Sequence, residues 1–174
     1  MRVTLEEWTL DRKEDLIRIC NEVDRSYLAE RLPYPYTEAD ATWWLGMVAE
    51  QEGKDGVFRA ILVDGKVAGN ISVERKSDVY HRDGELGYML SPSYSSRGIM
   101  TEAVRQICEA AFAELDLLRI TALVYAPNTA SVRVLEKNGF LREGYMRQAV
   151  CKKEKVYDLC IFGRLREEGE SPRS

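Results

Sequence analysis

We predict a mixed α/β (α+β) fold, in which a central mixed β-sheet of about seven strands is flanked by helices on both faces. Two observations predict it. Segments of strand composition and segments of helical periodicity follow one another in the order β-α-α-β-β-β-α-β-α-β-β. The chain has 174 residues, 45% hydrophobic and 31% charged, which suits one domain that buries roughly 70% of its unfolded surface. We expect this domain over residues 1–166 and a polar tail over 167–174.

The first third of the sequence predicts one strand and two helices. Val3–Leu10 has strand composition, and Asp15–Val23 carries apolar residues at helical spacing. The L-P-Y-P-Y segment at 32–36 cannot continue a helix, so we expect an extended loop there. A second helix should begin at Thr37, because T-E-A-D matches a capping box in which Asp40 replaces the usual Glu or Gln. Its predicted apolar face consists of Trp43, Trp44, Met47 and Val48.

The middle of the sequence predicts three strands and a long helix. Val57–Val63 and Lys66–Val73 are separated by Asp64-Gly65, a dipeptide that favours a short hairpin. A further strand is expected over Gly84–Leu90, and an amphipathic helix over Gly98–Leu115. The apolar residues on one face of this helix are Met100, Val104, Ile107, Ala111 and Leu115.

The last third predicts a strand, a short helix and a strand pair. We expect a strand over Arg119–Tyr125 and a helix over Asn128–Asn138 that ends at Gly139. Phe140–Val150 and Lys153–Gly163 are expected to form the final two strands. The chain contains no internal repeat and no low-complexity tract, which supports a single domain.

Charge is distributed unevenly along the chain. The net charge is −4, and residues 1–56 hold thirteen acidic against seven basic residues. The remaining residues hold sixteen acidic against eighteen basic ones. An acidic protein lacks the basic stripe that neutralises phosphates, so we do not expect nucleic acid as a partner. The acidic segment either faces solvent or helps to receive a cationic substrate.

The location and the cofactor class are limited by what the sequence lacks. There is no run of 18 apolar residues and no apolar core of a signal peptide after Met1, so we expect no membrane association. Cys20 and Cys108 fall in helical patterns among apolar residues, which suits reduced thiols in the cytoplasm. With His81 as the single histidine and no C-x-x-C pair, we expect no metal site.

A serine- and glycine-containing loop precedes the long helix. Ser95, Ser96, Arg97 and Gly98 lead into it, so the first amide groups of the helix have no internal acceptor. Those amides and the helix dipole form an anion site, and a glycine lets the backbone approach phosphate oxygens. A dinucleotide-binding loop is a poor alternative, because Gly98 has no partners for G-x-G-x-x-G.

Together these motifs resemble those of the GNAT superfamily of acyl-CoA-dependent N-acetyltransferases, and more narrowly its RimJ/RimL-like branch. The resemblance extends from P-Y-T-E-A-D-A before the second helix to N-x-x-S-x-x-x-L-E-K-x-G-F near the end. It implies the GNAT fold, acetyl-CoA as the co-substrate, a primary amine as the acceptor and dimerisation through the last strands. The chain departs from the usual phosphate loop at Ser95, Ser96 and Met100, where the family often has Arg or Gln, Gly, and Gly or Ala.

The resemblance implies a set of cofactor-binding residues. The loop would bind the CoA pyrophosphate through backbone amides, Asn128 would bind the pantetheine arm, and Lys137 would reach a phosphate. Asn128 also suits a helix N-cap and Lys137 a helix C-terminus, so both have a structural alternative. The full set is Met89, Leu90, Ser91, Ser96, Arg97, Gly98, Ile99, Met100, Thr101, Asn128, Ser131 and Lys137.

The resemblance also implies the catalytic groups. Many family members have a tyrosine as general acid where this chain has Leu135, so Ser131 is expected to donate a hydrogen bond to the departing thiolate. The backbone N–H of Leu90 would stabilise the oxyanion. Glu85 is the predicted general base, directly or through a water; its alternative role is that of a surface carboxylate paired with an arginine.

Three functional interpretations remain open. The first is a protein amino terminus, as in the RimJ/RimL-like branch, with Tyr34, Tyr36 and Glu85 as acceptor contacts. The second is a polyamine or aminoglycoside, which the acidic 1–56 segment would favour. The third is a non-catalytic acyl-CoA-binding or regulatory module, which the departures at Leu135, Ser95 and Ser96 would permit.

Overall fold

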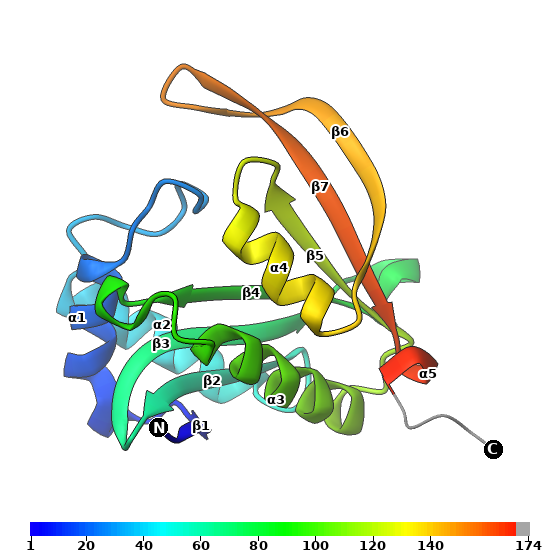
Figure 1. Cartoon of the computed structure of the whole chain (residues 1–174). Helices are drawn as coiled ribbons and strands as arrows, with labels where there is room; N and C mark the ends of the chain where they lie inside the picture. Colours follow the sequence, from blue (N-terminus) through cyan, green and yellow to red (C-terminus); the bar gives the residue numbers. More distant parts are fainter. Residues whose placement is uncertain (170–174) are drawn as a thin grey trace.

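The protein is a seven-stranded sheet with helices on both faces (Figure 1), in a computed structural model that describes residues 1–169. The predicted order of elements is confirmed. The strands are β1 Val3–Glu7, β2 Gly56–Val63, β3 Lys66–Arg75, β4 Asp83–Leu90, β5 Arg119–Tyr125, β6 Leu141–Lys152 and β7 Lys155–Leu165. The helices are α1 Lys13–Glu22, α2 Glu38–Gln51, α3 Ile99–Glu114, α4 Thr129–Lys137 and the short α5 Arg166–Gly169. Of the tail expected over 167–174, residues 170–174 lie outside the described residues.

The sheet has one parallel pair between two antiparallel parts. Its order is β1-β2-β3-β4-β5-β7-β6, and only β4 and β5 run parallel. The Asp64-Gly65 hairpin between β2 and β3 is confirmed, with φ of 50° and 84° at the two turn residues. Positive φ at both positions matches the right-handed twist of the flanking strands, which is why Asp-Gly predicted it.

Alternating side chains of β2 separate two hydrophobic clusters. All eight residues of the strand are buried. Val57 and Ile61 pack in the cluster that contains α3, whereas Phe58 and Leu62 pack in the cluster that contains α1 and α2. Because successive strand side chains point to opposite faces, a strand that is apolar except at Arg59 fits a position that is covered on both sides. The α1–α2 pair and the α3–α4 pair thus cover opposite faces of the sheet (Figure 1).

Helix α2 begins as predicted, and Trp44, Met47 and Val48 of its predicted apolar face pack in the α1–α2 cluster. Thr37 Oγ1 accepts from the Asp40 amide at 3.3 Å, and Asp40 Oδ2 accepts from the Thr37 amide at 2.9 Å, so the capping box is confirmed. The predicted apolar face was wrong at Trp43, which is 71% exposed, while Trp44 packs edge-on against Trp8. Helical spacing instead places one buried row toward the sheet. This row is Ala41, Leu45 and Val48.

Other boundaries shift by a few residues. The first strand ends at Glu7 rather than Leu10, because Leu10 is 69% exposed and opens a short 3₁₀ turn that leads into α1. The predicted Arg119–Tyr125 strand agrees with β5 at both ends. Cys20 and Cys108 are buried free thiols in α1 and α3.

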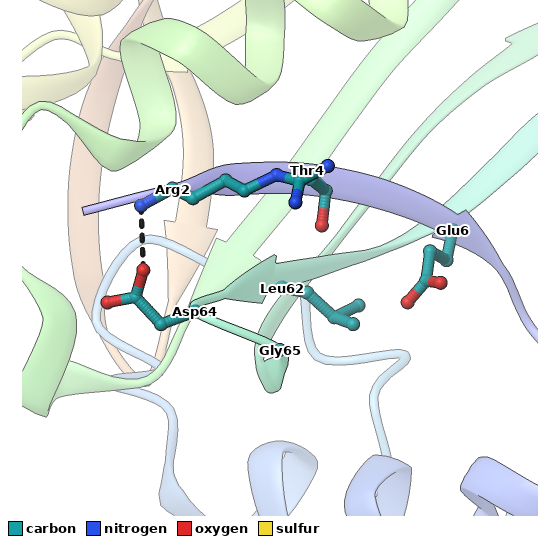
Figure 2. Close-up of a pocket in the computed structure, with 6 residues that line it drawn as sticks. All are labelled: Arg2, Thr4, Glu6, Leu62, Asp64 and Gly65. Atoms are coloured by element: carbon teal, nitrogen blue, oxygen red, sulfur yellow. Dashed lines mark hydrogen bonds between the residues drawn. The ribbon is translucent and has the colours of Figure 1, made fainter.

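A shallow hollow lies on the outer edge of the sheet, between β1 and the β2–β3 turn (Figure 2). It is lined by Arg2, Thr4, Glu6, Leu62, Asp64 and Gly65. The Arg2 amide donates to Asp64 Oδ1 at 2.8 Å across it. None of the predicted site residues lines this hollow, and its strands β1 and β2 are four and three places away from β5 in the sheet. It therefore gives no support for a second candidate site.

Candidate active site

Strands β4 and β5 stop pairing shortly after they begin. Their parallel ladder joins three residue pairs, Asp83 with Arg119, Gly84 with Ile120 and Glu85 with Thr121. From Leu86 to Leu90, β4 pairs with β3 alone. We call the stretch over which the two strands do not pair with each other, 86–90 of β4 and 122–125 of β5, the β4–β5 opening (Figure 1). The resemblance implied this splaying of the Gly84–Leu90 strand, and the register agrees with it.

Backbone groups of β4 face this opening at every second residue. The Ser91 amide donates to the Ala68 carbonyl at 2.8 Å, and the Lys76 amide donates to the Asp83 carbonyl at 2.9 Å. In an antiparallel ladder the backbone groups that bond to the neighbour alternate along the strand. Since Asp83 and Ser91 bond toward β3, the amides of Tyr88 and Leu90 point to the other side. The Leu90 N–H, predicted as the oxyanion donor, is thus directed toward the β4–β5 opening.

The N-terminus of α3 carries no side-chain cap. Its N-cap residue is Gly98, in the left-handed region with φ of 75°, and no atom lies within 4 Å of where a Cβ would stand. Ser96 also has a positive φ of 61°, and Arg97 is exposed with its guanidinium 5.9 Å from the Tyr94 ring centroid. The first amides of the helix are therefore accessible to an anion. The loop fits a CoA pyrophosphate held by backbone donors, with Arg97 and the Ser96 hydroxyl beside it.

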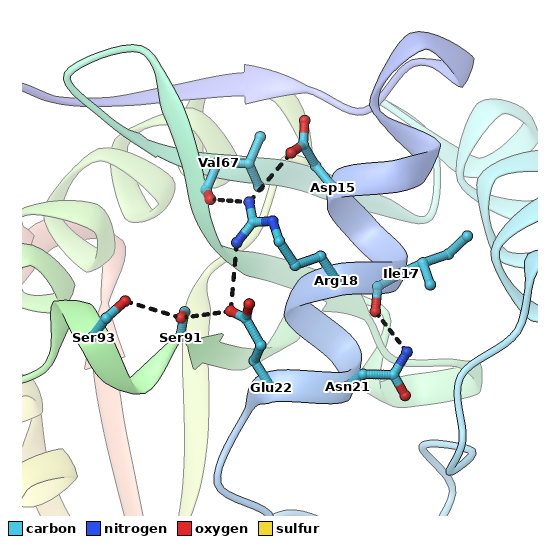
Figure 3. A network of polar contacts seen from close by, with 8 residues as sticks. All are labelled: Asp15, Ile17, Arg18, Asn21, Glu22, Val67, Ser91 and Ser93. Carbon is cyan, nitrogen blue, oxygen red and sulfur yellow. Dashed lines mark hydrogen bonds and ion pairs between the residues drawn. The ribbon is translucent and has the colours of Figure 1, made fainter.

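The start of this loop is fixed to α1 by a polar network (Figure 3). Ser91, which is 2% exposed, donates from Oγ to Glu22 Oε2 at 2.9 Å. Arg18 bonds to the same carboxylate at 3.4 Å and to the Val67 carbonyl at 2.8 Å. The Ser91 hydroxyl is directed to Glu22 rather than outward, so a cofactor contact at Ser91 would have to come from its backbone.

Helix α4 brings Ser131 to β4. The Asn128 side chain caps the helix by accepting from the Ser131 amide at 3.3 Å, which confirms the expected N-cap. The Ser131 hydroxyl forms a hydrogen bond with the hydroxyl of Tyr88 on β4. Leu135, at the position where the resemblance expects a tyrosine, is fully buried in the core. Sequence reasoning missed Tyr88, which supplies a phenol to the same place from a different element.

The other predicted cofactor residues lie in different environments. Ile99 is 1% exposed and packs in the core, and Met100 packs against the same cluster, so their side chains serve the fold. Met89 packs against the α1–α2 cluster on the opposite face. The Thr101 carbonyl accepts from the side chain of Asn138 at 3.1 Å. Lys137 is exposed in the last turn of α4.

Two carboxylates lie opposite each other on β3 and β4. Glu85 is the Cα partner of Glu74 in the antiparallel register. Burial raises the pKa of Glu74 above its usual value near 4.5, the Arg31 guanidinium lowers it and the charge of Glu85 raises it further. Glu85 and Met89 point to the α1–α2 face, because side chains alternate along the strand, whereas Tyr88 points to the α3–α4 face. The candidate base and the candidate thiolate donor thus lie on opposite faces of the sheet.

The two tyrosines predicted as acceptor contacts differ in accessibility. Tyr34 is 71% exposed, and its ring centroid lies 4.9 Å from the Arg25 guanidinium. Tyr36 is only 5% exposed, and its amide donates to Asn21 Oδ1 at 2.8 Å, which fixes the loop to α1. An acceptor can reach Tyr34 in this structure, whereas Tyr36 is part of the α1–α2 core.

Three tyrosines are in contact with one another at the end of β5 that borders the β4–β5 opening. Tyr27, in the loop between α1 and α2, lies edge-on to Tyr125 of β5 at 5.9 Å and to Tyr157 of β7 at 6.2 Å. Lys152, near the tip of the β6–β7 hairpin, donates to the carbonyls of Arg25 and Leu28 in the same loop. These contacts hold the hairpin against the α1–α2 loop, beside the end of β5 that borders the opening.

Two further findings concern residues 1–169. No group of three or more His, Cys, Asp or Glu side chains gathers there as the ligands of a metal ion would. No helix of this part of the chain is long and apolar enough to cross a membrane.

Comparison with known proteins identifies the family of this chain. Residues 2–141 match the model described as an acetyltransferase (GNAT) domain. Among curated proteins, YdaF of Bacillus subtilis, whose name assigns it to the ribosomal N-acetyltransferases, is 32% identical over 119 residues. That match covers 68% of this chain and 64% of YdaF. The SPbeta prophage-derived uncharacterized N-acetyltransferase YokL of the same organism is 31% identical over 81% of this chain and 78% of YokL.

More distant similarities concern the acceptor and the fold. The spermidine N(1)-acetyltransferase of Escherichia coli is 30% identical over 81 residues, or 47% of this chain and 43% of that protein. The solved structure of RimL, a ribosomal-protein α-N-acetyltransferase in complex with coenzyme A, superimposes with a TM-score of 0.81. The superposition covers 97% of this chain and 96% of RimL at 17% identity, which shows a shared fold.

Proposed function

The chain belongs to the GNAT acetyltransferase family, and on that premise we propose that it is an N-acetyltransferase of the RimJ/RimL-like branch. It would transfer an acetyl group from acetyl-CoA to the amino terminus of a protein, of the ribosomal-protein type. The observation that carries this proposal is the β4–β5 opening, with the Leu90 amide directed into it and Ser131 beside it. A thioester in the opening would have an oxyanion donor and a thiolate donor within one stretch of β4 and α4.

Donor binding would rest mainly on backbone groups. The uncapped amides at the start of α3 would hold the pyrophosphate, with Gly98 leaving room for the phosphate oxygens. Solved structures with this fold hold coenzyme A, which supports the same co-substrate here. Because main-chain donors carry this contact, the departures at Ser95, Ser96 and Met100 are compatible with it.

The reaction would proceed by direct attack in a ternary complex. The acceptor amine loses a proton to Glu85, directly or through a water, and its nitrogen forms a bond to the acyl carbon. The Leu90 N–H stabilises the oxyanion, and the carbon–sulfur bond breaks when the carbonyl re-forms. The electron pair of that bond stays on sulfur, and Ser131 donates a hydrogen bond to it. The opposite faces occupied by Glu85 and Ser131 support an attack from one side and a departure on the other.

Mixed charge on the α1–α2 face supports a peptide acceptor. Arg31 interacts with Glu74 there. Arg25 lies in the loop between α1 and α2, as Arg31 does, and Lys152 of β6 contacts this loop. A purely acidic pocket would favour a polyamine, whereas these cations would repel one. The α-amino group of a peptide, with a pKa near 8, is also partly neutral at physiological pH and needs less help from a base.

A small amine is the second candidate acceptor. It is supported by the acidic balance of residues 1–56, by the facing carboxylates Glu74 and Glu85, and by similarity to a spermidine acetyltransferase. A non-catalytic acyl-CoA-binding module is set aside, because membership of this family makes the chain an acyltransferase.

Acetyl-CoA-dependent thiol release tests the proposal. The assay compares amino-terminal peptides of ribosomal proteins, spermidine and aminoglycosides at equal concentration. We expect release with one or more peptides and little with the small amines. Release with spermidine alone would replace the peptide acceptor by a polyamine. Mass spectrometry of the product, which locates the acetyl group on the α-amine or on a lysine, completes the test.

We further propose that the enzyme works in the cytoplasm as a homodimer. Buried free thiols at Cys20 and Cys108 suit a reducing compartment. Exposed apolar side chains on the last two strands support a contact between copies. They are Leu141, Tyr145, Met146 and Val156. Sedimentation at micromolar concentration would show a dimer, and a monomer at every concentration would contradict it.

A further inference from the structure

A hydroxyl pair joins β4 to α4 beside the β4–β5 opening. The Tyr88 hydroxyl and Ser131 Oγ form a hydrogen bond between residues 43 positions apart in sequence. Among residues 1–169, each hydroxyl is the other's only protein partner. The Asn128 side chain bonds to the Ser131 amide and leaves the Ser131 hydroxyl free for Tyr88. The contact is thus specific to the two hydroxyl groups.

Either hydroxyl of this pair can donate to the other, so Tyr88 is able to act as the donor as long as it is protonated. Burial raises the pKa of Tyr88 above its usual value near 10, and the hydrogen bond with Ser131 offsets part of this effect. The phenol therefore keeps its proton at neutral pH. A serine hydroxyl has one donor and two acceptor positions. When Tyr88 donates to Ser131 Oγ, the Ser131 proton is free to point away from Tyr88, toward a second acceptor.

The position of Tyr88 on β4 indicates that this second acceptor would lie in the β4–β5 opening. Tyr88 is two residues before Leu90, and both amides face the opening. Its ring packs on the α3–α4 face, the side from which α3 presents its uncapped N-terminus. Leu135, one turn after Ser131, is fully buried and has no polar group to offer. The second hydroxyl at this place comes from Tyr88 on β4.

We propose that Tyr88 is the positioning residue of Ser131: by donating to Ser131 Oγ it orients and polarises the serine hydroxyl, so that the serine proton bonds to the sulfur of the coenzyme. This inference rests on the proposed function and adds a residue to it. No proton leaves Tyr88 in the step. The carbon–sulfur bond breaks, its electron pair stays on sulfur, and the thiolate is stabilised by the Ser131 O–H until solvent protonates it.

A purely structural role for the pair predicts different behaviour. If the hydrogen bond only fastens α4 to β4, its loss should lower the melting temperature and should not depend on the sulfur of the ligand. If Tyr88 acts through Ser131, its loss should matter only when a thiolate is present and only while Ser131 is intact. Stability and thiolate recognition are therefore measured separately.

The test uses ligand binding rather than turnover. Calorimetry compares CoA with desulfo-CoA, which lacks the thiol, at pH 6.5 and pH 9. A free thiol has a pKa near 8.5, so the thiolate predominates only at the higher pH. In the wild-type protein we expect the affinity for CoA, relative to the affinity for desulfo-CoA, to rise about tenfold from pH 6.5 to pH 9. We call this rise the thiolate gain. Tyr88→Phe, which removes one oxygen atom, should lose most of this gain and leave desulfo-CoA binding unchanged.

The matched variants separate the two roles. Ser131→Ala should abolish the gain, and adding Tyr88→Phe to it should change nothing further. Tyr145→Phe is the control, because its hydroxyl also bonds to a single side chain, that of Asp158 on the β6–β7 hairpin. It should keep the full gain. With acetyl-CoA and a competent amine, Tyr88→Phe should lower kcat and leave KM for acetyl-CoA unchanged.

Three results would overturn the inference. They are a wild-type protein with no gain for the thiolate, a Tyr88→Phe variant that keeps the gain, and a Tyr88→Phe effect that persists in Ser131→Ala. If no amine releases thiol while the pH-dependent gain is intact, the proposed acceptor fails and the role of Tyr88 stands. Should Tyr88→Phe unfold, Ser131→Thr provides a second measurement, since it keeps the hydroxyl that Tyr88 orients and should keep the gain.

Discussion

The two faces of β4 are assembled in different ways. On the α3–α4 face, the groups that would bind the donor come from two short stretches, each with its own pattern in the sequence. One is residues 95–101, the loop and the first residues of α3, and the other is the start of α4. On the α1–α2 face, Glu74, Glu85 and Arg31 meet only because β3 and β4 pair in one register and the α1–α2 loop lies over them. The first face depends on local geometry, and the second depends on register.

This difference teaches where a substitution should act. Changes on the α3–α4 face should alter the handling of acetyl-CoA for every acceptor, because the groups there are backbone donors and hydroxyls. Changes on the α1–α2 face should alter the response to pH and to the kind of amine, because the groups there are charged and partly buried. Four substitutions test this division, from the largest expected effect to the smallest.

Ser131→Ala should produce the largest loss. Without its hydroxyl the departing thiolate has no donor, and positioned proton or hydrogen-bond donors contribute on the order of 100-fold to such steps. We expect kcat to fall about 100-fold with every acceptor, while the affinity for acetyl-CoA measured by calorimetry stays the same. An unchanged kcat would remove Ser131 from the mechanism. Ala130→Ser in the wild-type background, which adds a hydroxyl one residue away, is the control and should not alter kcat.

Gly98→Val should weaken coenzyme binding by about tenfold, the scale of an anion's interaction with a helix N-terminus. Gly98 has a φ of 75° and open space where a Cβ would stand, so a valine strains the backbone and fills the place of the phosphate oxygens. Gly53→Val is the matched control, since Gly53 has a φ of 76°, equally open space and a position in the turn after α2. Both variants should lose similar stability in thermal unfolding, and only Gly98→Val should lose affinity. Equal affinity in the two variants would contradict the phosphate loop.

The same division explains what the sequence could predict. The capping box at Thr37, the Asp64-Gly65 hairpin and the Asn128 cap depend on neighbours within a few residues, and all three are confirmed. The facing carboxylates were missed because the predicted third strand stopped at Val73, and because a one-residue change of register would turn Glu74 to the other face.

Tyr88 and Trp43 show two further limits of the sequence. The Tyr88–Ser131 contact joins two elements that no periodicity relates, so only the tertiary structure brings the hydroxyls together. Trp43 is apolar and was expected inside, but helix phase decides burial, and the row at Ala41, Leu45 and Val48 faces the sheet.

Glu85→Gln should act on the amine rather than on the coenzyme. We expect kcat/KM for an amino-terminal peptide to fall only about fivefold near pH 8, since an α-amine with a pKa near 8 is already half neutral. A spermidine acceptor should lose more, because its amines titrate nearer 10.4, the value of a lysine. Steady-state kinetics at saturating acetyl-CoA measures both. If Glu74→Gln lowers kcat/KM and Glu85→Gln does not, Glu74 rather than Glu85 is the base.

Glu74→Gln should have the smallest effect, a gain in stability at neutral and alkaline pH. The pKa of Glu74 in the folded protein is raised above its usual value near 4.5, so the fold favours the protonated carboxyl. Its contribution to stability is full below pH 4.5 and is lost as the pH rises through the raised pKa. A glutamine is neutral throughout and ends the repulsion with Glu85 across the strand pair. We expect the variant to be more stable than the wild type by up to about 1 kcal/mol at pH 8 and nearly equal to it at pH 4.

The control for this last comparison is Glu154→Gln, an exposed carboxylate at the turn between β6 and β7. Urea unfolding at pH 4, 6 and 8 should give a difference between variant and wild type that grows with pH for Glu74 and stays flat for Glu154. A difference that is independent of pH would mean that Glu74 acts through packing rather than charge. The α1–α2 face would then lose the pH-dependent carboxylate that distinguishes it from the α3–α4 face.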